Sequence, residues 1–137
     1  VKKALAIYGN TPDLNPLVRL AAETQYGRLL VKLGRDAAAV DLMRRALAEL
    51  ASRTDAVSLG MATEVRGVLG AALLSARPDE GLPMLEAAHA ELLAKSGPAS
   101  ATVRQHREQL LRFHATRGDA DAIARLQATA GSDVGQR

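Results

Sequence analysis

The sequence predicts an all-α fold, and three observations support this prediction. Hydrophobic residues make up 47% of the chain and are dominated by alanine and leucine, which are strong helix formers. Aromatic residues are only 2%, and few stretches alternate in the β-branched and aromatic manner of strands. The chain also repeats with a period of 42 residues: Ala4-Leu5, Ala46-Leu47 and Ala88-His89 recur at that interval, late in segments that read as helices.

The second and third copies of the repeat match beyond these dipeptides, since residues 38–47 lie over residues 80–89. Small residues fall on small ones and large apolar residues on large apolar ones, in the pairs Ala39/Gly81, Ala46/Ala88, Val40/Leu82, Leu42/Met84 and Met43/Leu85. A repeat of this length predicts stacked antiparallel helical hairpins, and arrays of such hairpins mostly bind other proteins. The sequence therefore favours an interaction scaffold.

The first elements follow from capping residues. Residues 1–8 read as the end of a helix closed by Gly9-Asn10, because glycine is favoured just past a helix end. A new helix begins at Asn15-Pro16, with asparagine as N-cap and proline in the first turn, and it runs to Gly34. Asp36 is expected to cap the next helix, whose apolar residues recur at spacings of three and four: Val40, Met43, Leu47 and Leu50.

The middle hairpin is expected to open at Asp55 or Thr54. Its first helix carries an apolar series and ends near Arg77-Pro78; the series is Leu59, Ala62, Val65, Leu69 and Leu73. Its second helix begins at Asp79 and ends at Ser96-Gly97-Pro98. Pro83 fits this helix only in the first turn, which predicts a start a few residues after Asp79.

The last hairpin is expected to open at Ser100 and turn at Gly118, with Asp119 as the cap of its second helix. Because the chain starts at Val1 in mid-helix and not at methionine, we expect a fragment whose targeting stays open. The predicted units are the end of a truncated repeat (1–8), three hairpins (13–52, 54–96 and 98–130) and a polar, disordered tail (131–137).

Composition limits the classes of partner and compartment. The net charge is +3 and the pI about 9.7, but both signs are mixed along the chain, and the scarcity of aromatics disfavours base stacking on nucleic acid. Without cysteine the chain has no disulfide or thiolate site, which fits a reducing compartment, and we expect a cytoplasmic protein. We also expect no membrane partner, because no run approaches the roughly 18 apolar residues that span a membrane.

The hairpins share one pattern, complete in the first and partial in the second, which lacks the turn glycine, and in the third: a small residue midway along the first helix, a large one three residues later, a glycine at the turn and small residues on the second helix. The first hairpin has Tyr26-Gly27, Leu30, Gly34, Ala39, Met43 and Ala46-Leu47; the second has Leu69-Gly70, Leu73, Gly81, Leu85 and Ala88, with Ala76-Arg77-Pro78 at the turn; the third has Leu110-Leu111, His114, Gly118 and Ala122. Small side chains let the two helix axes approach closely.

This pattern resembles the tetratricopeptide repeat over residues 1 to about 128. The 42-residue period is longer than the standard 34 and is similar to the long repeats of kinesin light chains and many bacterial proteins. The resemblance implies an α-solenoid that winds into a right-handed superhelix and binds a protein or peptide without catalysis. Such repeats also follow the catalytic domain of bacterial serine/threonine kinases, which implies as an alternative a region that recruits substrates or regulates a kinase.

In tetratricopeptide arrays the first helices of successive hairpins line a concave groove. The resemblance places the exposed groove positions of this chain at Thr24, Arg28 and Lys32, at Gly67, Ala71 and Ser75, and at Glu108, Arg112 and Thr116. Arg28, Lys32 and Arg112 make part of the groove positive and suited to an acidic peptide, or they are merely solvated. The paired asparagines of the chaperone-binding subclass are absent, which disfavours that function.

Catalytic, metal and cofactor sites are not expected. His106 and His114 lie eight residues apart, about 12 Å along one helix and too far for one metal, and His89 takes a packing position. No serine has a Gly-x-Ser-x-Gly context, and Gly67 and Gly70 have neither the lysine nor the strand of a phosphate loop.

Two further non-enzymatic roles stay open. A basic cluster could bind nucleic acid, although Arg104, Arg107 and Arg117 do not share one helix face and nearby acidic residues dilute it; its other members are Arg112 and Arg125. The fragment could also associate with itself through an apolar face near Leu17 and Leu20, which the missing preceding repeat leaves uncovered.

Overall fold

The fold is all-α, as the composition predicts. The computed structural model describes the backbone of residues 15–135 and the side chains of residues 15–129, so the helix expected over residues 1–8 lies outside the described residues. Residues 15–135 form six helices and no strand: α2 (Pro16–Lys32), α3 (Asp36–Leu50), α4 (Ala56–Leu73), α5 (Pro78–Ser96), α6 (Ala101–Arg117) and α7 (Ala120–Gly135).

Three of the expected N-caps form as side-chain hydrogen bonds. The Asn15 carboxamide oxygen accepts from the Leu17 N–H at 2.9 Å, with Pro16 opening α2. The Asp55 carboxylate accepts from the Ser58 N–H at 3.0 Å and from its hydroxyl at 2.8 Å. Asp119 accepts from the backbone N–H three residues later at 3.1 Å. Each bond satisfies a donor that the first turn of a helix leaves free.

Glycine ends α2 and α6 in the left-handed conformation. Gly34 has a φ of 75° and Gly118 a φ of 67°, values that other residues rarely adopt. The N–H of Arg35 then donates to the Leu30 carbonyl at 2.8 Å, the bond that closes a Schellman motif. These two hairpin turns therefore follow directly from the glycines that the sequence places there.

Two of the expected helix starts are wrong. Asp36 is the first residue of α3 and not its cap, because Arg35 takes the cap position without a side-chain hydrogen bond. The helix α5 begins at Pro78 and not after Asp79, so Pro83 is an interior residue. Pro78 has the favoured first position, and the exposed Pro83 ring is accommodated on the solvent side although it leaves the Asp79 carbonyl without its helical donor.

The end of α7 and the exposure of two leucines also differ from expectation. The helix α7 continues to Gly135, into the segment expected to be a polar tail. Leu20 is fully buried in the core and so cannot belong to the apolar face expected there for self-association, whereas Leu17 is partly buried. Leu59, expected on the apolar face of its helix, is 54% exposed because it lies in the first turn of α4, where Asp55 directs Ser58 inward instead.

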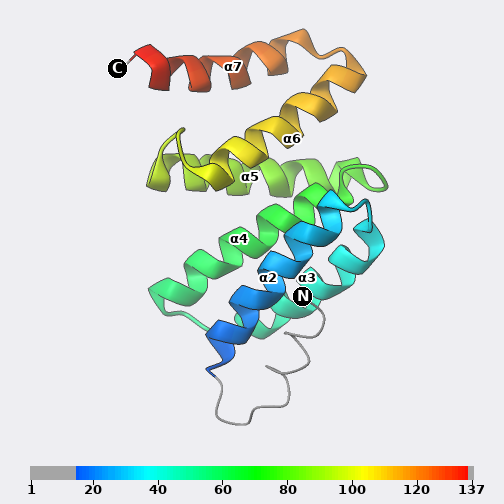
Figure 1. Cartoon of the computed structure of the whole chain (residues 1–137), viewed down its shortest axis with the longest axis vertical. Helices are drawn as coiled ribbons and strands as arrows, with labels where there is room; N and C mark the ends of the chain where they lie inside the picture. The colour runs from blue at the N-terminus through cyan, green and yellow to red at the C-terminus, as the bar shows by residue number, and fades with distance from the viewer. Residues whose placement is uncertain (1–14, 136–137) are drawn as a thin grey trace.

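The six helices form three antiparallel hairpins arranged along the longest axis of the molecule (Figure 1). The pairs are α2/α3, α4/α5 and α6/α7, and each pair contacts the next. The helix α4 is central, since it contacts α2, α3, α5 and α6. The first helices of the hairpins thus form the series α2, α4, α6, and α7 lies at the end farthest from α2 (Figure 1).

Small residues mark the closest helix crossings, as the repeat predicts. The Met43 side chain lies over Gly27, where a Cβ would come within 2.7 Å of its Cε. In the next hairpin a Cβ on Gly70 would come within 2.6 Å of the Leu85 backbone nitrogen. Met43 and Leu85, which lie 42 residues apart, are both fully buried. Leu85 is thus the counterpart of Met43 in the 42-residue repeat, and each lies close to a glycine of the facing helix.

The central helix differs from expectation in its apolarity. By length and composition alone, α4 could cross a membrane, with a mean hydropathy of 1.2 over Ala56–Leu73, whereas no such run was expected in this chain. Packing accounts for this composition, because 56% of the segment is buried and four other helices contact it.

Candidate partner-binding groove

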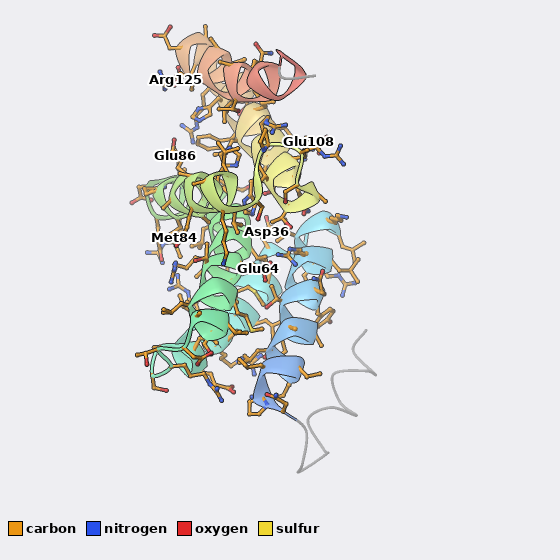
Figure 2. All side chains as sticks on the ribbon, turned by 90° about the vertical axis from the view of Figure 1, so that its left-hand side faces the viewer. Asp36, Glu64, Met84, Glu86, Glu108 and Arg125 are labelled. Atoms are coloured by element: carbon orange, nitrogen blue, oxygen red, sulfur yellow. The ribbon has the colours of Figure 1, made fainter. Side chains whose placement is uncertain are left out.

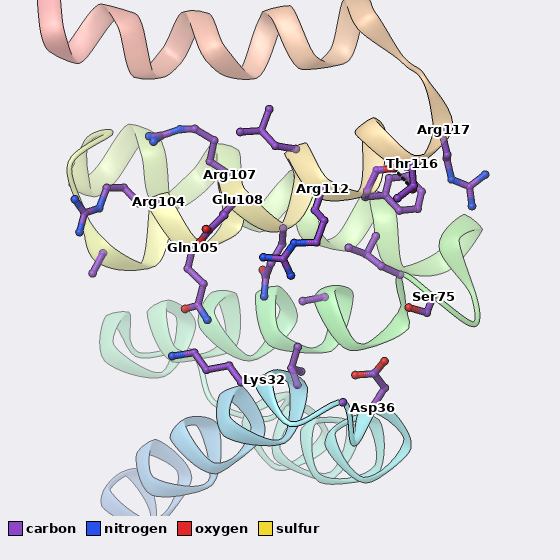
Figure 3. Close-up of a pocket in the computed structure, with 18 residues that line it drawn as sticks. Lys32, Asp36, Ser75, Arg104, Gln105, Arg107, Glu108, Arg112, Thr116 and Arg117 are labelled. Carbon is purple, nitrogen blue, oxygen red and sulfur yellow. Dashed lines mark hydrogen bonds between the residues drawn. The ribbon is translucent and has the colours of Figure 1, made fainter.

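A groove of about 1370 Å³ lies where the C-terminal ends of α2 and α4 approach α6, and its lining extends around α6 (Figure 3). Six of the nine positions expected in the groove line it: Lys32, Ala71, Ser75, Glu108, Arg112 and Thr116. They come from three helices that are far apart in the sequence, and the structure brings them to one surface. We call this surface the α2–α4–α6 groove.

The groove combines an apolar floor with charged walls. Its apolar lining residues are Val31, Ala71, Leu74, Ala101, Leu111 and Phe113. Gln105 and Arg112 project from α6 across the groove, whereas Arg104 and Arg117 lie toward its two ends (Figure 3). An amphipathic segment could therefore contact both an apolar and a cationic surface at once.

The charge of the groove is positive. Five basic side chains line it, Lys32, Arg104, Arg107, Arg112 and Arg117, against two acidic ones, Asp36 and Glu108, which is a net charge of +3. Lys32, Arg104 and Arg112 make no ion pair with any residue that the structure describes. Partial burial raises the pKa of Asp36, which makes this carboxylate easier to neutralise by a proton.

The remaining two cations are held in place. The Arg107 guanidinium donates through Nη2 to the Pro98 carbonyl at 2.8 Å. The guanidinium carbon of Arg117 lies 4.5 Å from the centre of the Phe113 ring, a cation–π contact that leaves the outer face of the charge free. The groove therefore has three unpaired cations and two oriented ones.

The structure places most of the basic cluster predicted in the C-terminal third around one groove. Arg104, Arg107, Arg112 and Arg117 all line the α2–α4–α6 groove, because the groove extends around α6 and not along one face of it. Arg125 lies outside it, on α7 beyond α6 as seen from α2 (Figure 2). Arg104, Arg107 and Arg117 thus lie on different faces of α6, as expected, and still line the same groove.

Thr24 is not a groove residue. Its side chain is buried, and its hydroxyl donates to the Leu20 carbonyl at 2.8 Å, which satisfies the donor without solvent. The sequence carries the signal for this: Thr24 follows Leu20 by four residues and precedes Gly27 by three, so it shares their buried face.

Arg28 lies beneath the groove instead of on its wall. Its side chain is 14% exposed, and Nη2 lies 3.9 Å from Oε1 of Glu64. That distance allows an ion pair but no hydrogen bond, and the buried Nη2 has no hydrogen-bond partner among the described residues. Arg28 and the buried Gly67 line a second, smaller cavity of about 10 Å³.

Beside that cavity, two buried histidines face each other from α5 and α6. The His89 and His106 ring centres lie 6.2 Å apart at 71°. Burial, and then the charges of His89 and Arg28, lower the pKa of His106 to about 4. Burial and Arg107 lower the pKa of His89. Both rings are therefore neutral at neutral pH.

The contact between these histidines could not be read from spacing, because they lie on different helices. The sequence places His89 at a packing position, where it is buried as expected, and His106 is buried as well. Residues 15–129 contain no cluster of three or more histidine, cysteine, aspartate or glutamate side chains able to hold a metal ion.

No known protein family, curated protein or solved structure matches this chain.

Proposed function

We propose that this chain is a non-catalytic binding module, a tetratricopeptide-like α-solenoid that takes an acidic peptide segment of a protein partner in the α2–α4–α6 groove. The observation that carries the proposal is the net charge of +3 in a groove where none of the five cations has an ion-pair partner among the described residues. The 42-residue repeat and the glycine crossings in the first two hairpins support the solenoid.

The size of the groove favours a peptide over a small molecule. Sites for small ligands are typically clefts of roughly 300–1,000 Å³ that bury most of the ligand. The groove is larger, about 1370 Å³, and runs across three helices. A peptide of several residues fills such a surface by placing acidic side chains on the walls and apolar ones on the floor.

The lining favours a peptide over nucleic acid. Arginine matches carboxylates in bidentate geometry, and four arginines line the groove. Binding of single-stranded nucleic acid relies on aromatic stacking platforms, but Phe113 is the one aromatic side chain of the lining, and the Arg117 guanidinium covers its ring. The charge therefore fits carboxylates better than bases.

The test is selection of random dodecapeptides displayed on phage against the full chain, followed by affinity measurement on the best synthetic peptide. We expect enrichment of aspartate and glutamate interspersed with apolar residues. The variant with Lys32→Glu and Arg112→Glu should bind that peptide at least tenfold more weakly, because two attractive charges become repulsive. The matched control, Arg45→Glu with Arg125→Glu, changes the net charge equally outside the groove.

Three outcomes contradict the proposal. The first is enrichment of peptides without acidic residues, and the second is an equal loss of affinity in both double variants. The third is tighter binding of a single-stranded oligonucleotide with a steep dependence on salt, which would indicate a nucleic-acid site instead.

A further inference from the structure

A small cavity beneath the α2–α4–α6 groove brings together polar atoms that have no partner. Arg28 Nη2, His106 Nδ1 and Gln109 Oε1 are buried without a hydrogen bond among the described residues, and all three side chains line the cavity. His106 is only 4% exposed. A buried polar atom without a hydrogen bond is costly, so three of them around one space indicate that something polar belongs there.

The cavity is a side chamber of the groove. Four residues line both spaces: Val31, Ala71, Gln105 and Gln109. Its volume of about 10 Å³ is at the lower limit for one water, roughly 10–15 Å³. A single oxygen atom therefore fits in it while the group that carries the oxygen stays in the groove.

The chemistry of the walls selects an anionic oxygen. The Arg28 guanidinium carries a positive charge, and Glu64 lies too far from Nη2 to take its hydrogen. The neutral imidazole of His106 can donate from Nδ1, and the Gln109 amide can present its NH₂ group to the cavity by turning over. Three donors, one of them charged, disfavour a metal cation and suit a carboxylate.

Gly67 makes room for this arrangement. A Cβ at this position would lie 2.7 Å from Nε2 of His106 and would push the ring into the cavity. The glycine in the middle of α4 thus lets the imidazole lie against the helix backbone and form one wall.

We propose that this side chamber, lined by Arg28, His106 and Gln109, is a subsite for one carboxylate oxygen that an aspartate or glutamate side chain of the partner inserts from the groove. That the carboxylate belongs to a peptide in the groove rests on the proposed function. That the side chamber binds a carboxylate does not. With the wall charges alone, an acidic peptide could bind the groove in several registers. The subsite would select one register by fixing the position of one acidic residue.

Acetate is the probe for this subsite. The full chain is titrated with sodium acetate at pH 7 against sodium chloride at matched ionic strength, and the His106 ring and Gln109 side-chain amide resonances are followed by NMR. We expect saturable shifts with acetate that chloride does not reproduce. Arg28→Gln should weaken acetate binding at least tenfold, whereas Arg112→Gln, on the groove wall, should change it less than twofold.

Gln109→Glu is a second test variant, which keeps the experiment decisive if Arg28→Gln fails to fold. It places a carboxylate beside Arg28, so this variant should fold and should give no acetate response. The absence of saturable shifts, equal shifts with chloride, or an unchanged response in Gln109→Glu would each overturn the subsite. Acetate binding without selection of acidic peptides would retain the subsite for a free carboxylate and reject the groove proposal; acidic peptides without acetate binding would do the reverse.

Discussion

At the scale of single residues, the buried histidines are the most unusual feature of the described chain. His89 and His106 face each other among Arg28 and Arg107, and no acidic group is a cause of either pKa shift. Every charged group that acts on them therefore disfavours protonation. The pair has the packing role of apolar residues only while both rings stay neutral.

This environment predicts a loss of stability in acid. The pKa of His106 is about 4 in the folded chain and 6.5 once the chain is unfolded, so between these values only the unfolded state takes up the proton. The free energy of unfolding should fall as the pH decreases from 6.5 to 4, by on the order of 3 kcal/mol for this group. Above pH 6.5 neither state takes up this proton, so the full stability that comes from a neutral His106 is present.

Urea denaturation at several pH values between 7.5 and 4 measures this dependence. His106→Gln should flatten the curve in that range, because it removes the titrating ring while the rest of the chain titrates as before. Equal slopes in the two proteins would contradict the assignment to His106.

At the scale of elements, the contact of α4 with α5 depends on a glycine that no side chain can replace. A Cβ on Gly70 would meet the Leu85 backbone nitrogen at 2.6 Å and the Gly81 carbonyl oxygen at 2.9 Å. Backbone atoms cannot turn aside as a side chain can. The two helices would have to separate, which would uncover the buried residues on both.

Gly70→Ala should therefore lower the free energy of unfolding by about 2 kcal/mol or more, despite the better helix propensity of alanine. Gly60→Ala on the same helix is the matched control. Its Cβ would meet only the flexible end of Lys95 at 3.4 Å, so we expect a stabilisation of about 0.5–1 kcal/mol. Chemical denaturation measures both, and a stable Gly70→Ala protein would refute the close crossing.

At the scale of the whole molecule, the core is unevenly distributed. One cluster of thirteen buried hydrophobic residues joins α2, α3 and α4. The cluster that holds α6 and α7 has three, Leu74, Leu85 and Leu110, with partly buried neighbours such as Phe113 and Leu126. The junction of α5 with α6 also contains the unpartnered nitrogens of His89 and His106.

Amide hydrogen exchange should follow this distribution. We expect the slowest exchange in α4 and faster exchange in α6 and α7, because segments with few buried contacts open locally before the whole chain unfolds. Leu110→Ala should accelerate exchange in α6 and α7 while α2 and α3 keep their protection. Uniform protection across α4, α6 and α7 would instead indicate one cooperative unit.

The helices and their ends could be predicted from the sequence because they depend on short-range interactions. The caps Asn15 and Asp55 and the terminal glycines Gly34 and Gly118 act within one turn. The predicted start of α5 is wrong for an equally short-range reason. Pro78 is a stronger start signal than Asp79, so α5 begins there and Pro83 falls in its interior.

The sequence alone thus determined an all-α chain, its six described helices within a few residues, and six of the residues that line one groove. Only the tertiary structure decided that Thr24 is buried, that four arginines share the groove, and that Arg28, His106 and Gln109 surround a cavity. The reason is physical: a helix periodicity specifies which side chains share a face, but the distance and angle between two helices specify which faces meet.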